Sequence, residues 1–181
     1  MQKLSMTELN RITVDEFRQA NKIPLVIVLD NIRSQHNTGS VFRTSDAFRV
    51  SKIYLCGITA TPPNREIQKS ALGATESVAW EYRESTLETI EALKAEGFTI
   101  VAAEQATSSI SPHQLEITEG SKYALVLGNE VQGVDDEVMN HCELCIEIPQ
   151  YGTKHSLNVS VSAGILIWDF FNKFNTMHSR N

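Results

Sequence analysis

Short runs in which every residue is apolar recur along this chain, and the segments between them are long enough for helices. Leu25–Leu29 and Tyr123–Leu127 are the clearest of these runs. A continuous apolar run of this length is typical of a strand buried on both faces, as in a parallel sheet. With weaker members included, strands are predicted at Leu25–Leu29, Lys52–Cys56, Val78–Tyr82, Phe98–Ala103, Tyr123–Leu127 and Leu144–Ile148. Strands that alternate with helices predict an α/β fold whose parallel sheet is covered on both faces.

Capping residues mark the predicted helices between these strands. Ser85 is placed to cap a helix that Gly97 stops, and Thr7, Asn37 and Ser156 are candidate N-caps of three other helices. Asn158 lies further into the last helix, where we expect no capping role for it. The predicted helices span residues 7–20, a segment that follows the polar loop 30–40, and residues 65–72, 86–95, 135–141 and 156–174.

A length of 181 residues is typical of one domain with a sizeable core. The predicted division is an N-terminal helical extension over residues 1–22, a main domain over residues 23–176 and a tail over residues 177–181. No apolar run approaches the length of a membrane span, and the N-terminus lacks the apolar core of a signal peptide. Three cysteines do not suggest a disulfide framework, so we expect a cytoplasmic location.

Charge is distributed unevenly along the chain. The net charge of −6 argues against indiscriminate binding to nucleic acid, yet the acidic residues are concentrated in residues 71–147. The flanking segments carry more basic than acidic residues, so local binding of a polyanion is compatible with an acidic protein. The candidate phosphate-binding residues near the first polar loop are Arg33, Arg49, Lys52, Arg65 and Lys69. The alternative for each of them is a solvated surface charge.

The last predicted helix is apolar nearly all round from Val161 to Phe171. A helix on the surface of a monomer would show a single apolar stripe. This helix therefore either runs deep within the domain or packs against a second subunit. We favour a contribution from a second subunit, which predicts a homodimer.

Three polar loops interrupt the otherwise apolar pattern. They contain Asn37–Arg43, Gly128–Val134 and Ile148–Val161, and the last two directly follow or end predicted strands. Ligands of parallel α/β proteins bind beyond the carboxyl ends of strands. Each loop taken alone is also compatible with an ordinary capped turn. The glycine fingerprints of dinucleotide-binding proteins and Walker-type NTPases are absent, as is the G-x-S-x-G motif of α/β-hydrolases.

Cys142 and Cys145 form a C-x-x-C pair. A structural zinc site requires about four ligands, and the chain has no second cysteine pair. A redox-active pair is expected at a helix N-terminus, whereas this pair precedes and enters a predicted strand. We therefore interpret both residues as structural thiols and expect no metal site.

Taken together, the three polar loops resemble the SpoU/TrmH family of RNA ribose 2′-O-methyltransferases, which belongs to the SPOUT superfamily. The first motif is Asn37-x-Gly39-x-x-x-Arg43, and the second runs from Leu127 to Val134 as L-G-N-E-x-x-G-V. The third, I-P-x-x-G-x-x-x-S-L-N-V-S-V, spans Ile148–Val161 and is the most specific of the three. The resemblance covers about residues 22–175. Only about twenty residues precede the first predicted strand, so we expect no separate RNA-binding domain there, and the mode of RNA recognition stays open.

The resemblance implies a parallel-sheet SPOUT fold with a C-terminal deep trefoil knot over residues 23–176, a rare exception to the rule against threaded chains. It also implies S-adenosyl-L-methionine as cofactor, an RNA substrate, and a homodimer with active sites near the interface. We favour tRNA over rRNA, because a compact dimer without an added recognition domain suits a small folded RNA. The alternative is a non-catalytic RNA-binding protein of the same fold.

The resemblance assigns proton handling to Arg43, although a guanidinium is a poor base. Arg43 either relays a proton with the help of a phosphate or stabilises negative charge that develops on the 2′-oxygen. Asn37 is expected to orient Arg43 or the ribose, and Glu130 to hold Arg43 or the loop. Ser156 and Asn158 are expected to bind ribose, phosphate or each other.

The residues expected to bind the cofactor fall into three groups. Backbone groups of Gly128, Ile148 and Leu157 are expected to contact its adenine and ribose. The end of the fourth predicted strand lines the same pocket, and so do further members of the second and third motifs. These additional residues are Ala103, Glu104, Gln105, Asn129, Gly133 and Pro149.

Overall fold

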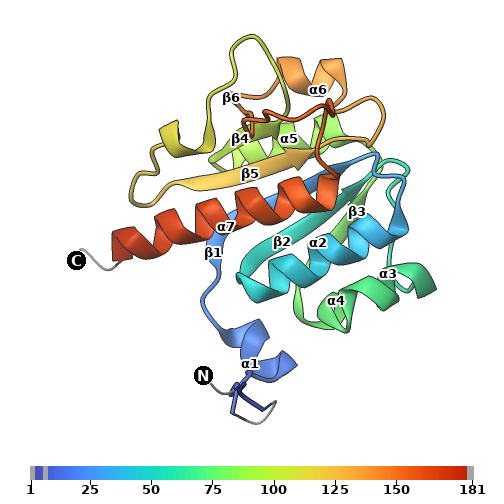
Figure 1. The fold of residues 1–181 in the computed structure, drawn as a ribbon, viewed down its shortest axis with the longest axis vertical. Coiled ribbons are helices and arrows are strands. Elements are labelled where there is room, and N and C mark those ends of the chain that lie inside the picture. Colours follow the sequence, from blue (N-terminus) through green and yellow to red (C-terminus); the bar gives the residue numbers. More distant parts are fainter. Residues whose placement is uncertain (1–2, 6–7, 179–181) are drawn as a thin grey trace.

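Six strands form one sheet with helices on both of its faces in the computed structural model, which describes residues 3–5 and 8–178 (Figure 1). The strands are β1 (Ile23–Asp30), β2 (Val50–Cys56), β3 (Trp80–Arg83), β4 (Phe98–Ala103), β5 (Lys122–Leu127) and β6 (Leu144–Ile146). The helices are α1 (Val14–Gln19), α2 (Gln35–Ala47), α3 (Arg65–Ala71), α4 (Ala74–Ser77), α5 (Thr86–Ala95), α6 (Asp136–Asn140) and α7 (Val159–His178), with a short 3-10 turn η1 (Pro112–Gln114).

Every strand pairing in the sheet is parallel, and the strand order is β3-β2-β1-β5-β4-β6. This confirms the predicted α/β fold. Because parallel strands end at the same edge, the carboxyl ends of β1, β5, β4 and β6 lie together, and ligands bind at such edges. The predicted strands differ from the observed ones mainly at their ends, since β3 begins at Trp80 and β6 ends at Ile146. The trefoil knot and the division into extension, domain and tail stay predictions.

Alternate side chains of β1 enter two separate cores. Leu25, Ile27 and Leu29 pack with residues of α2 and α7 such as Phe42 and Phe170. On the other face of the sheet, Val26 and Val28 pack with Ile90 and Leu93 of α5. A strand covered on both faces has no polar side, which explains the continuous apolar runs.

The first helix is shorter than predicted. It begins at Val14, and Thr13 caps it by accepting a hydrogen bond from the Glu16 amide while the Glu16 carboxylate accepts from the Thr13 amide. This reciprocal pair satisfies two donors at the helix start. Thr7, the predicted cap, lies outside the described residues. The Arg18 guanidinium donates to the Glu76 carbonyl at 2.7 Å, which ties α1 to α4.

The predicted cap of the second helix is wrong. Helix α2 begins at Gln35, and Ser34 is its N-cap, with its hydroxyl accepting from the Asn37 amide at 3.2 Å. Asn37 therefore lies within the first helical turn, where its side chain is buried. Serine caps as well as asparagine does, which leaves the Asn37 side chain for another role.

The start of α7 also differs from the prediction. Ser156 does not cap this helix, because the helix begins at Val159 and residues 152–157 remain irregular. Asn158 is the cap instead, and its Oδ1 accepts from the Ser160 amide at 2.9 Å. The expectation that Asn158 has no capping role is therefore wrong, since asparagine is among the strongest N-cap residues.

Helix α7 presents apolar residues on two faces. Ala163, Ile167 and Phe170 are fully buried against the sheet. Ile165 and Trp168 belong to a second, solvent-facing stripe and are 40% and 50% exposed. The full set of this exposed α7 stripe is Leu157, Val161, Ile165 and Trp168. No described helix is long and apolar enough to cross a membrane.

Candidate active site

The carboxyl ends of β4, β5 and β6 frame a cleft of about 550 Å³. Volumes of this size are typical of sites that enclose a small molecule. Parts of the second and third motifs border the cleft. Of the residues predicted to bind the cofactor or act in catalysis, it is lined by Ala103, Glu104, Gln105, Gly128, Asn129, Glu130, Gly133, Ile148, Ser156, Leu157 and Asn158. Pro149 does not line it.

The loop after β5 is closed tightly on itself. Asn129 and Gly133 exchange two backbone hydrogen bonds, of 2.8 and 2.9 Å. A Cβ on Gly128 would lie 2.1 Å from the backbone of both Gly133 and Val134, so only glycine fits there. The Glu104 carboxylate accepts from the Val134 amide at 3.1 Å and fixes the loop to the end of β4. This wall of the cleft is therefore held rigidly.

A chain of hydrogen bonds joins all three motifs. Asn37 donates through Nδ2 to Glu130 Oε1 at 3.0 Å. Its Oδ1 in turn accepts from Asn158 Nδ2 at 3.2 Å. Because Ser34 caps α2, the Asn37 side chain is not needed as a cap. It connects α2 to the loop after β5 and to the start of α7 instead. Of the three residues only Asn37 is buried, and its two hydrogen bonds fix the orientation of its amide.

Glu130 also binds the start of α2. Its carboxylate accepts from the amides of Arg33 and Ser34 at 2.9 and 3.0 Å. Burial by itself raises the pKa of Glu130, but these backbone hydrogen bonds and the one from Asn37 outweigh it and leave the pKa below its ordinary value. The carboxylate is thus ionised at the positive end of the α2 dipole. Among the described residues, Glu130 forms no hydrogen bond or ion pair with Arg43, which favours the expected role of holding the loop.

The backbone amides of the third motif are available to bind a ligand. Within the described residues, no amide from Ile148 to Leu157 donates a hydrogen bond. The segment is anchored through its carbonyl side, because Gln105 Nε2 donates to the His155 oxygen at 2.8 Å. Strand-to-helix loops with free amides are suited to binding polar groups of a ligand.

Arg43 lies apart from the cleft of its own chain. It is on α2 six residues after Asn37, which places it about 9 Å further along the helix axis. Its side chain is exposed and lines a different hollow. Within a single chain, the structure therefore gathers Asn37, Glu130 and Asn158 but leaves Arg43 outside the group.

The five predicted phosphate-binding residues come from several different elements of the fold. Lys52 is paired with Glu81 at 2.6 Å, and Lys69 with Glu66 at 2.7 Å. Arg33 precedes α2 and Arg65 begins α3, whereas Arg49 lines the same hollow as Arg43. Ion pairs, between strands for Lys52 and within α3 for Lys69, thus occupy two of the five side chains.

Some residues of the cleft were not predicted. Ile146 and Glu147 line it directly before Ile148, and the rule that ligands bind at strand ends could have included them. Leu166 also lines it, although it lies two turns into α7. No sequence signal marks Leu166, since its position depends on how α7 crosses the sheet.

The cysteines carry no reactive chemistry in this arrangement. Burial raises the pKa of Cys142 to about 11, and that of Cys145 is also raised. Neutral thiols are poor nucleophiles and poor metal ligands. Among the residues that the structure describes, no group of three or more His, Cys, Asp or Glu side chains is placed to hold a metal.

Comparisons with known proteins agree with this geometry. A family model described as the SpoU rRNA Methylase family matches residues 24–168. The 23S rRNA (guanosine-2′-O-)-methyltransferase RlmB of Neisseria meningitidis serogroup B is 31% identical over 84% of this chain and 60% of its own length. The crystal structure of a TrmH/SpoU tRNA modifying enzyme of A. aeolicus has 27% identity and a TM-score of 0.81, over 91% of this chain and 84% of that one.

A second solved structure, an AdoMet-bound rRNA methyltransferase of Sinorhizobium meliloti, has 25% identity and a TM-score of 0.77. The match covers 86% of this chain and 59% of that one. This chain spans 60% to 64% of the length of three curated relatives that it matches.

Proposed function

Because this chain belongs to the SpoU rRNA methylase family, we propose that it transfers a methyl group from S-adenosyl-L-methionine to a ribose 2′-hydroxyl of RNA. The observation that carries the proposal is the hydrogen-bonded chain Glu130–Asn37–Asn158 beside the cleft. It connects three segments far apart in sequence at one edge of the sheet. A methyltransferase of RlmB type among the relatives supports the ribose 2′-oxygen as the acceptor.

The cleft suits the proposed cofactor. Its volume of about 550 Å³ matches a ligand of nucleoside size, and Gly128 keeps its floor free of a side chain. Ile146, Ile148 and Leu166 supply apolar surface for a base. The carboxylates of Glu104, Glu130 and Glu147 also line it, and their negative charge favours the positively charged sulfur of this cofactor.

Two tasks remain for the protein, because the bound cofactor supplies a methyl group on a sulfonium that is already a good leaving group. The first is to align the 2′-oxygen, for which Ser156 and Asn158 lie at the cleft with hydroxyl and amide groups. The second is to favour loss of the 2′-hydroxyl proton. A guanidinium such as that of Arg43 does this by stabilising negative charge on the oxygen, or by relaying the proton through a phosphate.

We further propose a homodimer with its active sites near the interface. The exposed α7 stripe is an apolar surface of the kind that a subunit contact covers. Leu157, at one end of this stripe, also lines the cleft. A subunit packed over α7 therefore adjoins the cleft, and it offers a source for the Arg43 that the cleft lacks within one chain.

We favour tRNA as the substrate. The A. aeolicus structure, of which this chain covers 84%, is described as a tRNA modifying enzyme, whereas RlmB acts on 23S rRNA. A non-catalytic RNA-binding protein is the second candidate, but the presence of Asn37, Glu130 and Asn158 in one hydrogen-bonded chain beside the cleft favours the enzyme. A cytoplasmic location, with three free cysteines, is part of the proposal.

Calorimetry with S-adenosyl-L-methionine, followed by transfer of a labelled methyl group into bulk tRNA, tests the proposed function. We expect saturable binding and incorporation of label that requires the folded protein. Absence of binding at millimolar cofactor would contradict the proposed methyltransferase activity. Binding without any transfer to tRNA or rRNA would favour the non-catalytic alternative.

A further inference from the structure

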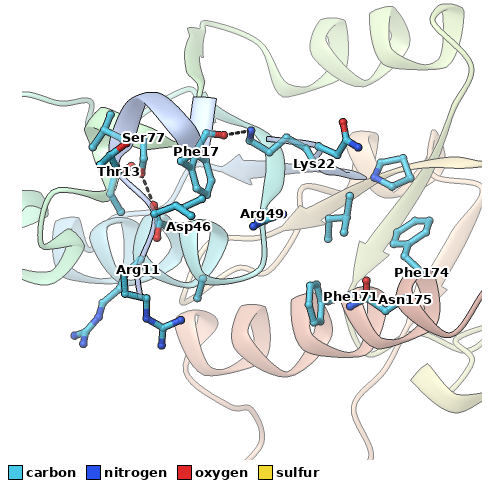
Figure 2. Close-up of a pocket in the computed structure, with 18 of the residues that line it drawn as sticks. Arg11, Thr13, Phe17, Lys22, Asp46, Arg49, Ser77, Phe171, Phe174 and Asn175 are labelled. Carbon is cyan, nitrogen blue, oxygen red and sulfur yellow. Dashed lines mark hydrogen bonds between the residues drawn. The ribbon is translucent and has the colours of Figure 1, made fainter. Parts of the chain in front are cut away.

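A groove of about 1620 Å³ lies between α1 and the C-terminal half of α7 (Figure 2). It exceeds the range of roughly 300–1,000 Å³ that is typical of sites for small molecules. Its walls come from the segment around α1, the end of α2, α4 and the last turns of α7. It shares no lining residue with the cleft or with the exposed α7 stripe.

Three arginines from separate positions in the fold line this groove. Arg11 precedes α1, Arg43 is on α2, and Arg49 follows the end of α2. All three are exposed, and their guanidinium groups form no hydrogen bond or ion pair with any described residue. Of the other exposed arginines, Arg18 and Arg83 form ion pairs with Asp15 and Glu81, whereas Arg33 and Arg65 form none with described residues. Unpaired guanidinium groups that converge on one groove suit the oxygens of phosphate.

The groove also contains carboxylates. Asp46, Glu76 and Glu119 line it, and the Asp46 carboxylate already accepts a hydrogen bond from the Ser77 hydroxyl. The acidic residues therefore do not neutralise the three arginines through any direct ion pair that the structure shows between described residues.

Arg49 adopts a backbone conformation that favours glycine. Its φ is 53°, directly after Phe48 at the C-terminal cap of α2. Glycine, or less often asparagine, is the usual residue at this position of a helix end. An arginine in the left-handed region is strained, and such strain is typically kept where the side chain has a function. Figure 2 shows Arg49 in the middle of the groove, between Lys22 and helix α7.

Lys22 faces Arg49 across this space. Burial, and secondly the charge of Arg49, lower the pKa of Lys22. The Lys22 ammonium donates to the Ala20 carbonyl at 2.7 Å and to the Phe17 carbonyl, which holds it near the end of α1. Two cations fixed close together are unfavourable by themselves and become favourable when an anion lies between or beside them.

We propose that this groove binds the phosphate backbone of RNA, with Arg11, Arg43 and Arg49 as its phosphate ligands. The proposal rests on the proposed function, in that the RNA is the methyl acceptor. Phe171 in the groove and Asn158 at the cleft are thirteen residues apart on α7, or roughly 20 Å along the helix. At about 3.4 Å per nucleotide, a strand of roughly six nucleotides spans that distance. RNA held in the groove can thus present a ribose to a cleft.

Arg49→Gly separates binding from folding. Glycine relieves the left-handed backbone, so the thermal unfolding temperature should stay the same or rise. If the groove binds phosphate, the same variant should bind RNA more weakly. A folding defect cannot produce that combination.

The experiment measures the affinity of the full-length protein for fluorescently labelled bulk tRNA from about 50 to about 200 mM salt. Arg49→Gly and Arg11→Ala should each weaken binding about 3- to 10-fold and reduce the salt slope by about 1. Arg83→Ala, which removes an exposed arginine outside the groove, is the matched control and should bind as the unmodified protein does.

The two groove variants, Arg49→Gly and Arg11→Ala, could instead show the same affinity and salt slope as Arg83→Ala. That result would contradict RNA binding by the groove. Labelled methyl transfer, run on the same samples, separates this result from failure of the proposed function. If the two variants transfer methyl groups normally and bind RNA with unchanged affinity, RNA binding by the groove is contradicted and the methyltransferase is not. Weakened RNA binding by the two variants, in a protein that transfers no methyl group, supports the groove and contradicts the methyltransferase.

Discussion

The cleft at the N-terminal ends of α2 and α7 and the groove near their C-terminal ends hold their polar side chains in opposite ways. Beside the cleft, Asn37 forms hydrogen bonds with both Glu130 and Asn158. In the groove, Arg11 and Arg49 have no partner among the described residues. Fixed geometry suits a site that must align reacting atoms, whereas free guanidinium groups suit a polyanion that supplies its own partners. The same two helices support both arrangements.

Substitution of Arg43 has the largest expected effect and tests the difference between the two regions most severely. It belongs to the groove by position and to the cleft by its proposed chemistry. Arg43→Ala should lower the rate of methyl transfer about 100- to 1,000-fold, as expected for loss of a charge that stabilises a developing oxyanion. Cofactor affinity, measured by calorimetry, should not change, because the side chain lies outside the cleft of its own chain.

Arg83→Ala, on β3, is the control for removal of an exposed arginine that lines neither the cleft nor the groove. A rate for Arg43→Ala within about twofold of that control would show that Arg43 takes no part in the reaction.

The exposed α7 stripe is the proposed subunit interface. A substitution in it tests whether a second subunit covers this surface. Ile165→Glu places a charge at a position that is 40% exposed in the single chain. If a second subunit covers it, burial of that charge should raise the dimer Kd by more than about 30-fold. Light scattering across a concentration series checks this. If Ile165→Glu dimerises with an unchanged Kd, the exposed α7 stripe is not the subunit interface.

Gly128→Ala should affect the cleft and spare the groove. The added Cβ would lie 2.1 Å from the backbone of Gly133 and Val134, so the loop must open. Overpacking of this kind costs about 1–3 kcal/mol of stability, and cofactor affinity should fall about 10-fold or more. Affinity for tRNA, which the groove governs, should stay the same.

Gly152→Ala is the matched control, since a Cβ there meets nothing within 4 Å. Equal unfolding temperatures for the Gly128 and Gly152 variants, from calorimetric scans, would mean that the loop is not closed as described.

Asn158 combines a structural and a functional contact, and Asn158→Asp separates them. Aspartate can still accept from the Ser160 amide, so the cap of α7 should be retained. It cannot donate to Asn37, and if the Asn37 amide turns, its contact with Glu130 is lost instead. We expect methyl transfer to fall about 10-fold with little change in stability.

Asn158→Ala loses the cap as well, and its unfolding free energy should fall by about 1 kcal/mol relative to Asn158→Asp. Urea titrations of the two variants measure this difference. If Asn158→Asp transfers methyl groups at the unmodified rate, the hydrogen-bonded chain has no bearing on the reaction.

The smallest expected effect concerns the acid stability that Glu130 supplies. Its pKa is lowered below the ordinary value of 4.5 in the folded protein. Its contribution is therefore present above about pH 4.5 and is lost as the pH falls through the folded-state pKa. Glu130→Gln should be slightly less stable at neutral pH, and this difference should vanish in acid. A difference that stays constant down to acid pH would contradict the lowered pKa.

Much of the fold could be predicted because each central strand carries its own signal. Leu25–Leu29 and Tyr123–Leu127 are buried on both faces, so their residues are apolar without interruption. Helix starts were harder. Ser34 and Asn37 are both good N-caps, and the choice between them depends on Glu130, which is distant in sequence. Local patterns do not contain such tertiary contacts.

The residues around the cleft were predicted from motifs, yet their grouping was not. Nothing in the sequence shows that Asn37 bonds to Asn158, or that Arg43 is turned toward another hollow. The groove was missed because its arginines come from separate segments and resemble ordinary surface charges. Only the left-handed backbone of Arg49, which the sequence does not show, marks it as unusual.

The central claim is that the ribose 2′-oxygen of RNA receives the methyl group. Nucleoside mass spectrometry after incubation of the protein with deuterated S-adenosyl-L-methionine and bulk tRNA or rRNA tests it most directly. We predict a 2′-O-methylnucleoside that carries the deuterated methyl group on its ribose, formed about 100- to 1,000-fold more slowly with Arg43→Ala. A deuterated methyl group found on a base, or none on any nucleoside, would contradict the account.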